Sequence, residues 1–161
     1  AVKILAAAVE KAPESIADIT SAVVFEASNI KGQSATAKLN QANTIVAAAI
    51  KAGGTTLTTD DIKDVSTAAL KSVQAAVINQ AVGDKTGAAA DAAVKDVEKT
   101  LTDIAKSVSS TVTTVVNKSS LDAETKNAVK ETVVNEIKVI KIDKTEAASV
   151  TEQNSSTASP S

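Results

Sequence analysis

The sequence predicts an all-α protein: an antiparallel bundle or array of four to six heptad-patterned helices, followed by a flexible C-terminal tail. Alanine, the strongest helix former, is the commonest residue and occupies 31 of 161 positions. Proline and glycine, which interrupt helices, occur only twice and five times. Apolar residues recur at alternating steps of three and four, the spacing of helices that pack along one narrow stripe.

The first segment, residues 2–29, carries a complete stripe of this kind. Pro13 interrupts it, and proline is tolerated in the first turn of a helix. We therefore expect a short helix that breaks near Ala12 and a second helix over 13–29. The apolar positions are Val2, Leu5, Val9, Ala12, Ile16, Ile19 and Val23.

Two further helices are expected over residues 33–52 and 59–82. Gly53 and Gly54 follow the first helix, as is typical of helix C-termini, and Gly83 closes the second. The stripe of the first is Ala35, Leu39, Ala42, Val46 and Ala49. The stripe of the second is Ile62, Val65, Ala69, Val73, Ala76 and Val77.

The fourth segment, residues 87–118, has the most regular apolar spacing in the chain. Its end, residues 107–116, is rich in β-branched and hydroxyl side chains, which by themselves would favour a strand. The continuing helical period predicts a helix there instead. The stripe is Val94, Val97, Leu101, Ile104, Val108, Thr111 and Val115.

The fifth segment is a helix expected over residues 120–140, with Ser119 as N-cap and Asp122 three residues later. Its last part, residues 137–142, has no clear period, so an extended strand is an alternative there. The residues that share a face are Val129, Val133, Ile137 and Ile140.

Residues 143–161 are poor in apolar side chains and rich in serine and threonine. This composition is typical of a flexible tail or a linker. The expected organisation is therefore a helical domain over 1–142 and a Ser/Thr-rich tail over 143–161.

Missing residue types exclude most enzyme and nucleic-acid functions. The chain contains no Cys, His, Met, Trp, Tyr or Arg. Most nucleophile–base arrangements need Cys or His, so we expect no enzyme, no catalytic, cofactor-binding or metal site, no cofactor and no small-molecule substrate. A net charge of −2, with one aromatic residue, is unsuited to nucleic acid. No apolar run is long enough for a transmembrane segment.

One acidic group could in principle hold a hard cation. Asp60, Asp61 and Asp64 supply carboxylates of the kind that calcium and magnesium prefer. However, these residues open a helix, and Thr58 with Asp61 has the spacing of a capping box. We therefore interpret the group as helix capping and solvation.

Other charged motifs have similarly ordinary interpretations. Lys85 lies in the string GDKTG, which lacks the spacing of a phosphate-binding loop, so we interpret residues 83–87 as a turn between helices. Opposite charges three or four apart predict solvent-side pairs on one helix. They are Asp91, Lys95, Asp96, Lys99, Asp103 and Lys106.

Thr100 and Thr111 are eleven residues apart, the period of Thr-based helical antifreeze proteins. The next step falls on Asp122 and a regular alanine spacing is missing, so an ice-binding or sugar-bearing face over 107–114 is disfavoured. Phe25, the single aromatic residue, is interpreted as one large side chain in a core of small ones.

Ala, Val, Thr and Ser together make up more than half of the chain. This composition is similar to that of flagellins, although the complete lack of Arg departs from that family. The chain starts Ala1-Val2-Lys3 without Met, so we expect a processed product or a fragment. The function predicted is therefore a structural subunit of an extracellular or cell-surface filament, sheath or layer, a homo-oligomer or polymer that associates through Ala/Val-rich helix faces.

Two alternatives remain open from the sequence. The chain could be a helical spacer or binding module of a larger surface protein or adhesin, with residues 143–161 as its linker. It could also be an amphipathic protein of lipid surfaces, although such helices usually carry more bulky apolar residues than six Leu and one Phe.

Overall fold

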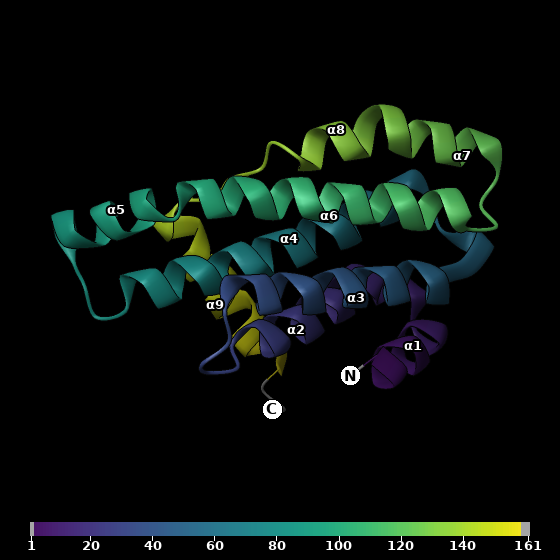
Figure 1. Ribbon diagram of the computed structural model, residues 1–161. Helices are drawn as coiled ribbons and strands as arrows, with labels where there is room; N and C mark the ends of the chain where they lie inside the picture. The colour runs from purple at the N-terminus through teal and green to yellow at the C-terminus, as the bar shows by residue number, and fades with distance from the viewer. Residues whose placement is uncertain (1, 159–161) are drawn as a thin grey trace.

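The computed structural model describes residues 2–158, with side-chain environments for residues 2–154. The fold is all-α: 84% of the described part of the chain is helical, and no strand occurs between residues 2 and 158 (Figure 1). The elements are α1 (Val2–Lys11), the 3₁₀ turn η1 (Pro13–Ser15), α2 (Ile16–Ser28), α3 (Ala35–Gly53), the 3₁₀ turn η2 (Gly54–Thr56), α4 (Thr59–Val82), α5 (Gly87–Asp96), α6 (Glu98–Lys118), α7 (Ala123–Ala128), the π-helical turn η3 (Val129–Val133), α8 (Val134–Ile137) and α9 (Lys144–Ala158).

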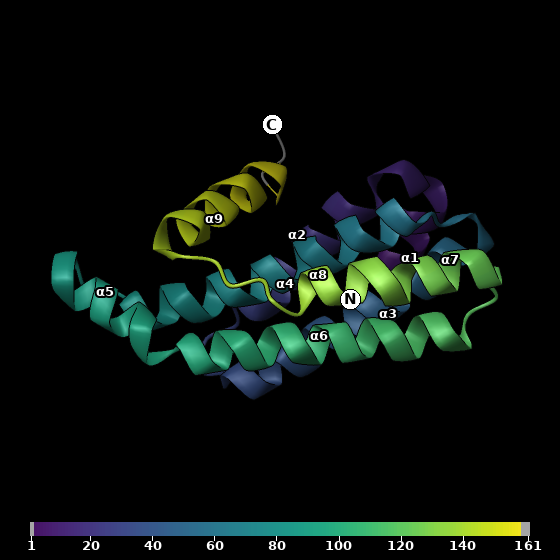
Figure 2. The ribbon, with the colours of Figure 1, turned by 90° about the horizontal axis from the view of Figure 1, so that it is seen from above.

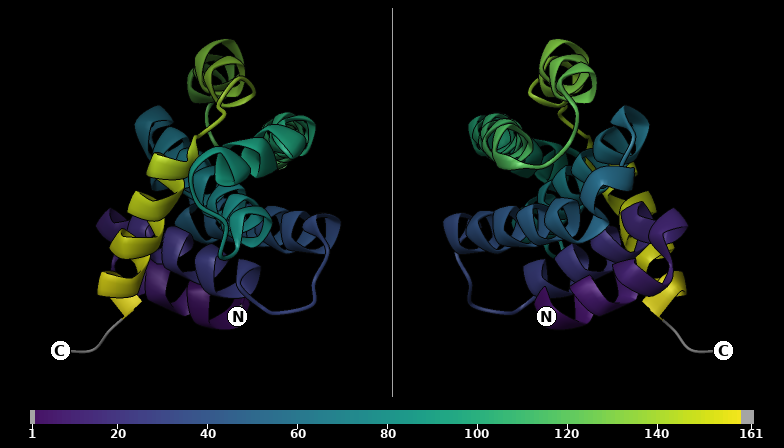
Figure 3. Two further views of the ribbon diagram at one scale, coloured as in Figure 1. Left: turned by 90° about the vertical axis from the view of Figure 1, so that its left-hand side faces the viewer. Right: turned by 90° about the vertical axis from the view of Figure 1, so that its right-hand side faces the viewer.

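Helix α4 is the centre of the molecule. It contacts α2, α3, α5, α6 and α9, and all seven consecutive side chains from Ser72 to Ile78 are buried. A helix whose whole circumference is buried in this way must be covered on every side. The other helices accordingly surround α4 when the molecule is seen end-on (Figure 3).

The helix predicted over 87–118 breaks at Val97 into α5 and α6. Several other helix ends are set by local signals as predicted. Thr58 Oγ1 accepts the Asp61 N–H at 3.1 Å and Asp61 Oδ2 accepts the Thr58 N–H at 2.9 Å, which completes the capping box. Gly54 and Gly83 follow α3 and α4 with φ values of 60° and 52°, a backbone region that strongly favours glycine. Pro13 starts η1, so the first segment breaks after Lys11 as expected.

The β-branched run near the end of α6 is helical, because its apolar members fall on the face that packs against the core. The buried stripe does not keep the predicted heptad register, however. After Val108 it continues to Val112 and Val116 in steps of four, whereas Thr111 and Val115 are only half-buried. From Leu101 to Val112 the buried positions step by three, four and four, which is an eleven-residue spacing of about 3.67 residues per turn and not a seven-residue repeat.

The fifth segment differs from the prediction at both ends. Asp122, not Ser119, is the N-cap of α7, and its Oδ1 accepts the Thr125 N–H at 2.7 Å. Ser119 instead donates to the Val116 carbonyl at 2.6 Å and so ends α6. At the other end the helix stops at Ile137, and the following residues form a turn and an irregular connection, not a strand.

The prediction of a flexible tail over 143–161 is wrong for residues 144–158, because these residues form α9. Figure 2 shows this helix beside α4, on the side away from α6. Asp143 Oδ1 accepts the Glu146 N–H at 2.8 Å and thereby caps the helix, while Ala147 is fully buried. Residues 159–161 of the predicted tail lie outside the described residues.

Hydrogen bonds between polar side chains explain how such a polar helix packs. Asn154 Oδ1 accepts from the Ser21 hydroxyl at 3.0 Å, and Asn79 Nδ2 donates to Thr151 Oγ1 at 2.7 Å. A helix of small residues approaches its neighbour closely enough to form such bonds, so a low apolar content did not prevent docking.

Candidate functional site

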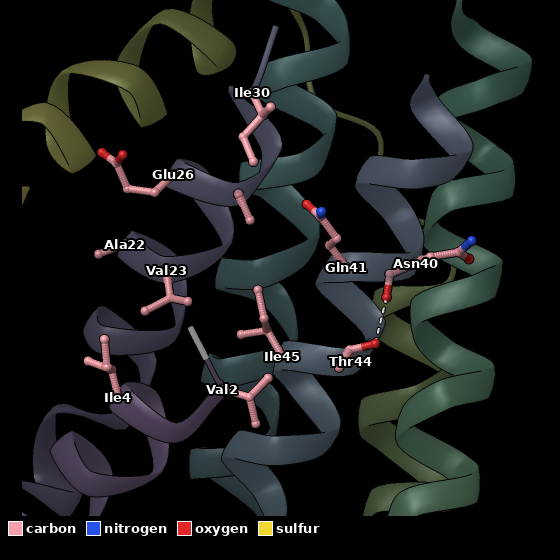
Figure 4. A pocket seen from close by; sticks show the side chains of 11 residues that line it. Val2, Ile4, Ala22, Val23, Glu26, Ile30, Asn40, Gln41, Thr44 and Ile45 are labelled. Atoms are coloured by element: carbon pink, nitrogen blue, oxygen red, sulfur yellow. Dashed lines mark hydrogen bonds between the residues drawn. The ribbon is translucent and has the colours of Figure 1, made fainter. Parts of the chain in front are cut away.

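An apolar groove with a volume of about 760 Å³ lies between α1, α2 and α3 (Figure 4). Helix α2 forms one wall and α3 the other, and the first residues of α1 lie across one end. The residues that line it are Val2, Ile4, Ala22, Val23, Glu26, Ala27, Ile30, Asn40, Gln41, Thr44 and Ile45. We call this set the α1–α3 groove.

Three large apolar side chains at the α1–α3 groove are open to solvent. Ile4 is 73% exposed, Ile30 is 49% exposed and Val2 is 38% exposed. Within residues 2–154, the one other large hydrophobic residue exposed to this degree is Val139, at 74%. Exposed apolar surface is therefore concentrated at the groove, and a contiguous patch of this kind marks an interaction site more often than scattered single residues do.

Polar groups at the groove offer hydrogen-bond acceptors and a negative charge. Glu26 lies at the outer edge on α2, and none of the ion pairs formed within residues 2–154 includes it. Gln41 Oε1 is buried without a hydrogen-bond partner. Thr44, by contrast, donates internally to the Asn40 carbonyl at 2.9 Å. The groove is therefore suited to an apolar group accompanied by a cation or an N–H donor.

The acidic group at the start of α4 acts as a helix cap. Asp61 is part of the capping box, and Asp60 and Asp64 are exposed on the same turns. Among residues 2–154 no three Asp or Glu side chains come together in a way that could hold a metal ion. The cation-binding interpretation therefore has no support in this geometry.

The remaining sequence candidates occupy surface or core positions. Lys85 lies in the turn between α4 and α5 and donates to the Ala81 carbonyl at 3.2 Å. Lys99 and Asp103 form the expected i,i+4 pair at 2.9 Å. Asp91 pairs instead with Lys144 of α9, at 2.7 Å, a contact that its spacing within one helix did not predict.

Phe25 is buried in α2. Thr100 and Thr111 both lie on α6, and Thr111 is half-buried, so part of the hydroxyl-rich run faces the protein interior.

Lys38 is a buried charged residue that no sequence pattern indicated. Its side chain is 4% exposed, and its ammonium donates to the Ser28 carbonyl and to the Ile30 carbonyl at 3.4 Å. A cation at the carbonyl end of α2 is favourable, since that end carries partial negative charge. Burial nevertheless lowers the pKa of Lys38.

Comparisons with known proteins identify no relative: no family model matches the sequence, and neither a curated protein nor a solved structure does. No helix among the described residues is long and apolar enough to cross a membrane.

A signal for the groove was present in the sequence. Ile4 and Ile30 are large apolar residues that do not belong to the predicted stripes, and both are exposed. Val23, in contrast, belongs to a predicted stripe, and Ile45 lies next to one. Their position between two walls depends on how α2 and α3 pack, which no local pattern encodes.

Proposed function

We propose that this protein is a structural subunit that associates with copies of itself through the α1–α3 groove, as part of an assembly outside the cell. The single observation that carries the proposal is the groove of about 760 Å³ with Val2, Ile4 and Ile30 exposed at it. Removing apolar surface from water is favourable by roughly 25 cal/mol per Å², so such a surface gains free energy when a partner covers it.

The chemistry of the groove favours binding over catalysis. Its side chains are mostly apolar, with one carboxylate and a few amide and hydroxyl groups. The chain contains no His or Cys that could act as base or nucleophile beside Glu26. A partner is therefore recognised by shape, apolar contact and charge.

A second copy of the same chain is the partner that the surface favours. The groove is unfilled within its own molecule, while Val139, the other strongly exposed hydrophobic residue within 2–154, lies on a different element. A pocket and an apolar projection at different places on one molecule form a heterologous contact, which generates open chains when the rotation does not close. Such growth fits the filament, sheath or layer expected from the composition.

The substitution Ile4→Lys tests the proposal, because it places a charge at the mouth of the groove without touching the core. We expect the variant to sediment as a monomer at concentrations at which the wild type forms larger particles. Thr114→Lys, at an exposed position of α6, is the matched control and should behave as wild type. Equal sedimentation of wild type and Ile4→Lys would refute the groove as the contact.

A further inference from the structure

We propose that the turn Lys138–Lys141 of a second copy fills the α1–α3 groove, with Val139 inserted between the walls and Lys138 beside Glu26. This inference rests on the proposed self-association and names the element that carries it. The turn has the sequence Lys-Val-Ile-Lys and connects α8 with α9. We call it the KVIK turn.

The KVIK turn presents Val139 on a fixed backbone. Gln74 Nε2, from the buried centre of α4, donates to the Ile140 carbonyl at 2.9 Å. The Ile140 N–H donates to the Ile137 carbonyl at 3.2 Å. Ile140 thus points inward and packs against the core, whereas Val139 is 74% exposed. A projection that is already ordered loses little conformational entropy when it binds.

Charge and hydrogen-bonding capacity of the two surfaces are complementary. Lys138 is exposed, and none of the ion pairs found within residues 2–154 includes it. Glu26 at the groove is likewise without an ion pair there, and Gln41 Oε1 lacks a donor. A lysine beside an apolar projection therefore meets a carboxylate beside an apolar groove. Such rim charges fix the register of a contact more than they strengthen it.

The two surfaces cannot meet within one molecule. Helix α8, which leads into the KVIK turn, lies at the top of Figures 1 and 3, and α1 lies at the bottom. Each copy therefore offers one projection and one groove on opposite sides. Head-to-tail repetition of the contact produces an open chain of copies when the rotation from one copy to the next does not close a ring.

A contact between one turn and one groove is small. Stable interfaces bury about 800 Å² on each partner, which a four-residue turn does not reach by itself. Association is therefore expected to be weak for each contact and to depend on concentration. Contacts between neighbouring chains of copies would add to it in a sheath or layer.

Charge reversal tests the pairing of Lys138 with Glu26. We expect Glu26→Lys and Lys138→Glu each to lower the association constant, measured by sedimentation velocity, by roughly fivefold, the upper range for an exposed ion pair. An equimolar mixture of the two variants should recover wild-type association, because every contact between unlike chains again joins opposite charges. Lys130→Glu, an exposed lysine in η3, is the control for net charge and should leave association unchanged.

A second variant, Val139→Lys, tests the inserted side chain and should abolish association while leaving the circular dichroism of the monomer unchanged. One combination of results separates the two proposals: the wild type associates, Ile4→Lys does not, and both Val139→Lys and Lys138→Glu associate as the wild type does. In that case the KVIK turn does not fill the groove, and self-association through the groove stands. If the mixture of Glu26→Lys and Lys138→Glu does not recover association, the pairing is wrong. A wild type that is monomeric at every concentration overturns both proposals.

Discussion

The side chain of Gln74 holds the backbone of Ile142 across the core of the protein: Gln74 Oε1 accepts the Ile142 N–H at 3.3 Å. Gln74 is completely buried, and its Nε2 also donates to the Leu101 carbonyl at 3.0 Å. One amide thus joins the central helix to α6 and to the irregular connection that precedes α9. This connection includes the KVIK turn, so its shape depends on a residue 68 positions away.

Gln74→Leu should destabilise the protein by about 1–3 kcal/mol, because it leaves buried backbone groups without their partner. Urea unfolding measured by circular dichroism gives this free energy. Gln80→Leu, at an exposed position of the same helix, is the matched control and should change stability little. Equal stability of the two variants would show that Gln74 does not hold the connection.

Thr58→Ala removes the hydroxyl half of the capping box at the start of α4. We expect a loss of about 1 kcal/mol in the free energy of unfolding, as is common for N-cap threonine. Thr55→Ala, in the exposed turn η2, changes the same residue type without breaking a cap. If both alanine variants unfold at the same urea concentration, the capping box contributes nothing measurable.

The stability that Asp122 contributes to the folded state should decrease at acid pH. The Thr125 N–H donates to its carboxylate and lowers the pKa of Asp122 below the ordinary 3.8. A carboxyl group with a lowered pKa in the folded state contributes stability above its unfolded pKa, and this contribution disappears as pH falls through the folded pKa.

The comparison variant is Asp122→Asn, which keeps a capping oxygen but does not titrate. Wild type should therefore melt at a higher temperature than Asp122→Asn near neutral pH, and the difference should vanish in strong acid. A difference that stays constant from about pH 6 to about pH 2 would contradict the assigned role.

The stability contributed by Lys38 should depend on alkaline pH, whereas that of Asp122 depends on acid pH. Because burial lowers its pKa in the folded state, the unfolded chain binds more protons between the lowered value and 10.5. Stability contributed by this residue therefore increases as pH rises through that window.

Thermal unfolding of wild type and Lys38→Met measures this contribution. The melting temperature of wild type relative to the variant should rise as pH approaches 10.5. Lys31→Met, at an exposed position in the neighbouring loop, should give no such trend. A pH-independent difference for Lys38→Met would show that this lysine is not desolvated.

Helix ends could be predicted from the sequence because their signals are local. Thr58 with Asp61, and glycine at 54 and 83, need only a few neighbouring residues to act. The helical period also identified residues 107–116 correctly, against their β-branched composition. At the helix ends, local residue preferences and the burial pattern predict the same structure. Over residues 107–116 they disagree, and the burial pattern determines the structure.

Contacts between distant residues could not be predicted in this way. The composition of residues 143–161, poor in apolar and rich in hydroxyl side chains, predicts a tail, whereas α9 is held by Ala147 and by hydrogen bonds to α2 and α4 instead of a wide apolar face. Asp143 with Glu146 three residues later nevertheless has the spacing of an N-cap signal, although the Ser/Thr-rich composition of the segment favours a tail.

The groove lay further beyond the reach of sequence patterns. Val23 belongs to a predicted stripe and Ile45 lies next to one, and only the packing of α2 against α3 turns them into the lining of a groove. Ile4 lies outside the predicted stripes, but the extent of its exposure, like that of Val139, follows from how the helices pack.

Particle mass measured by light scattering, as a function of protein concentration, tests self-association through the groove most directly. Self-association through the groove should give a mass that starts at 16.2 kDa in dilute solution and rises continuously with concentration, without a plateau at a small closed oligomer. A constant mass of one chain at every accessible concentration would contradict it.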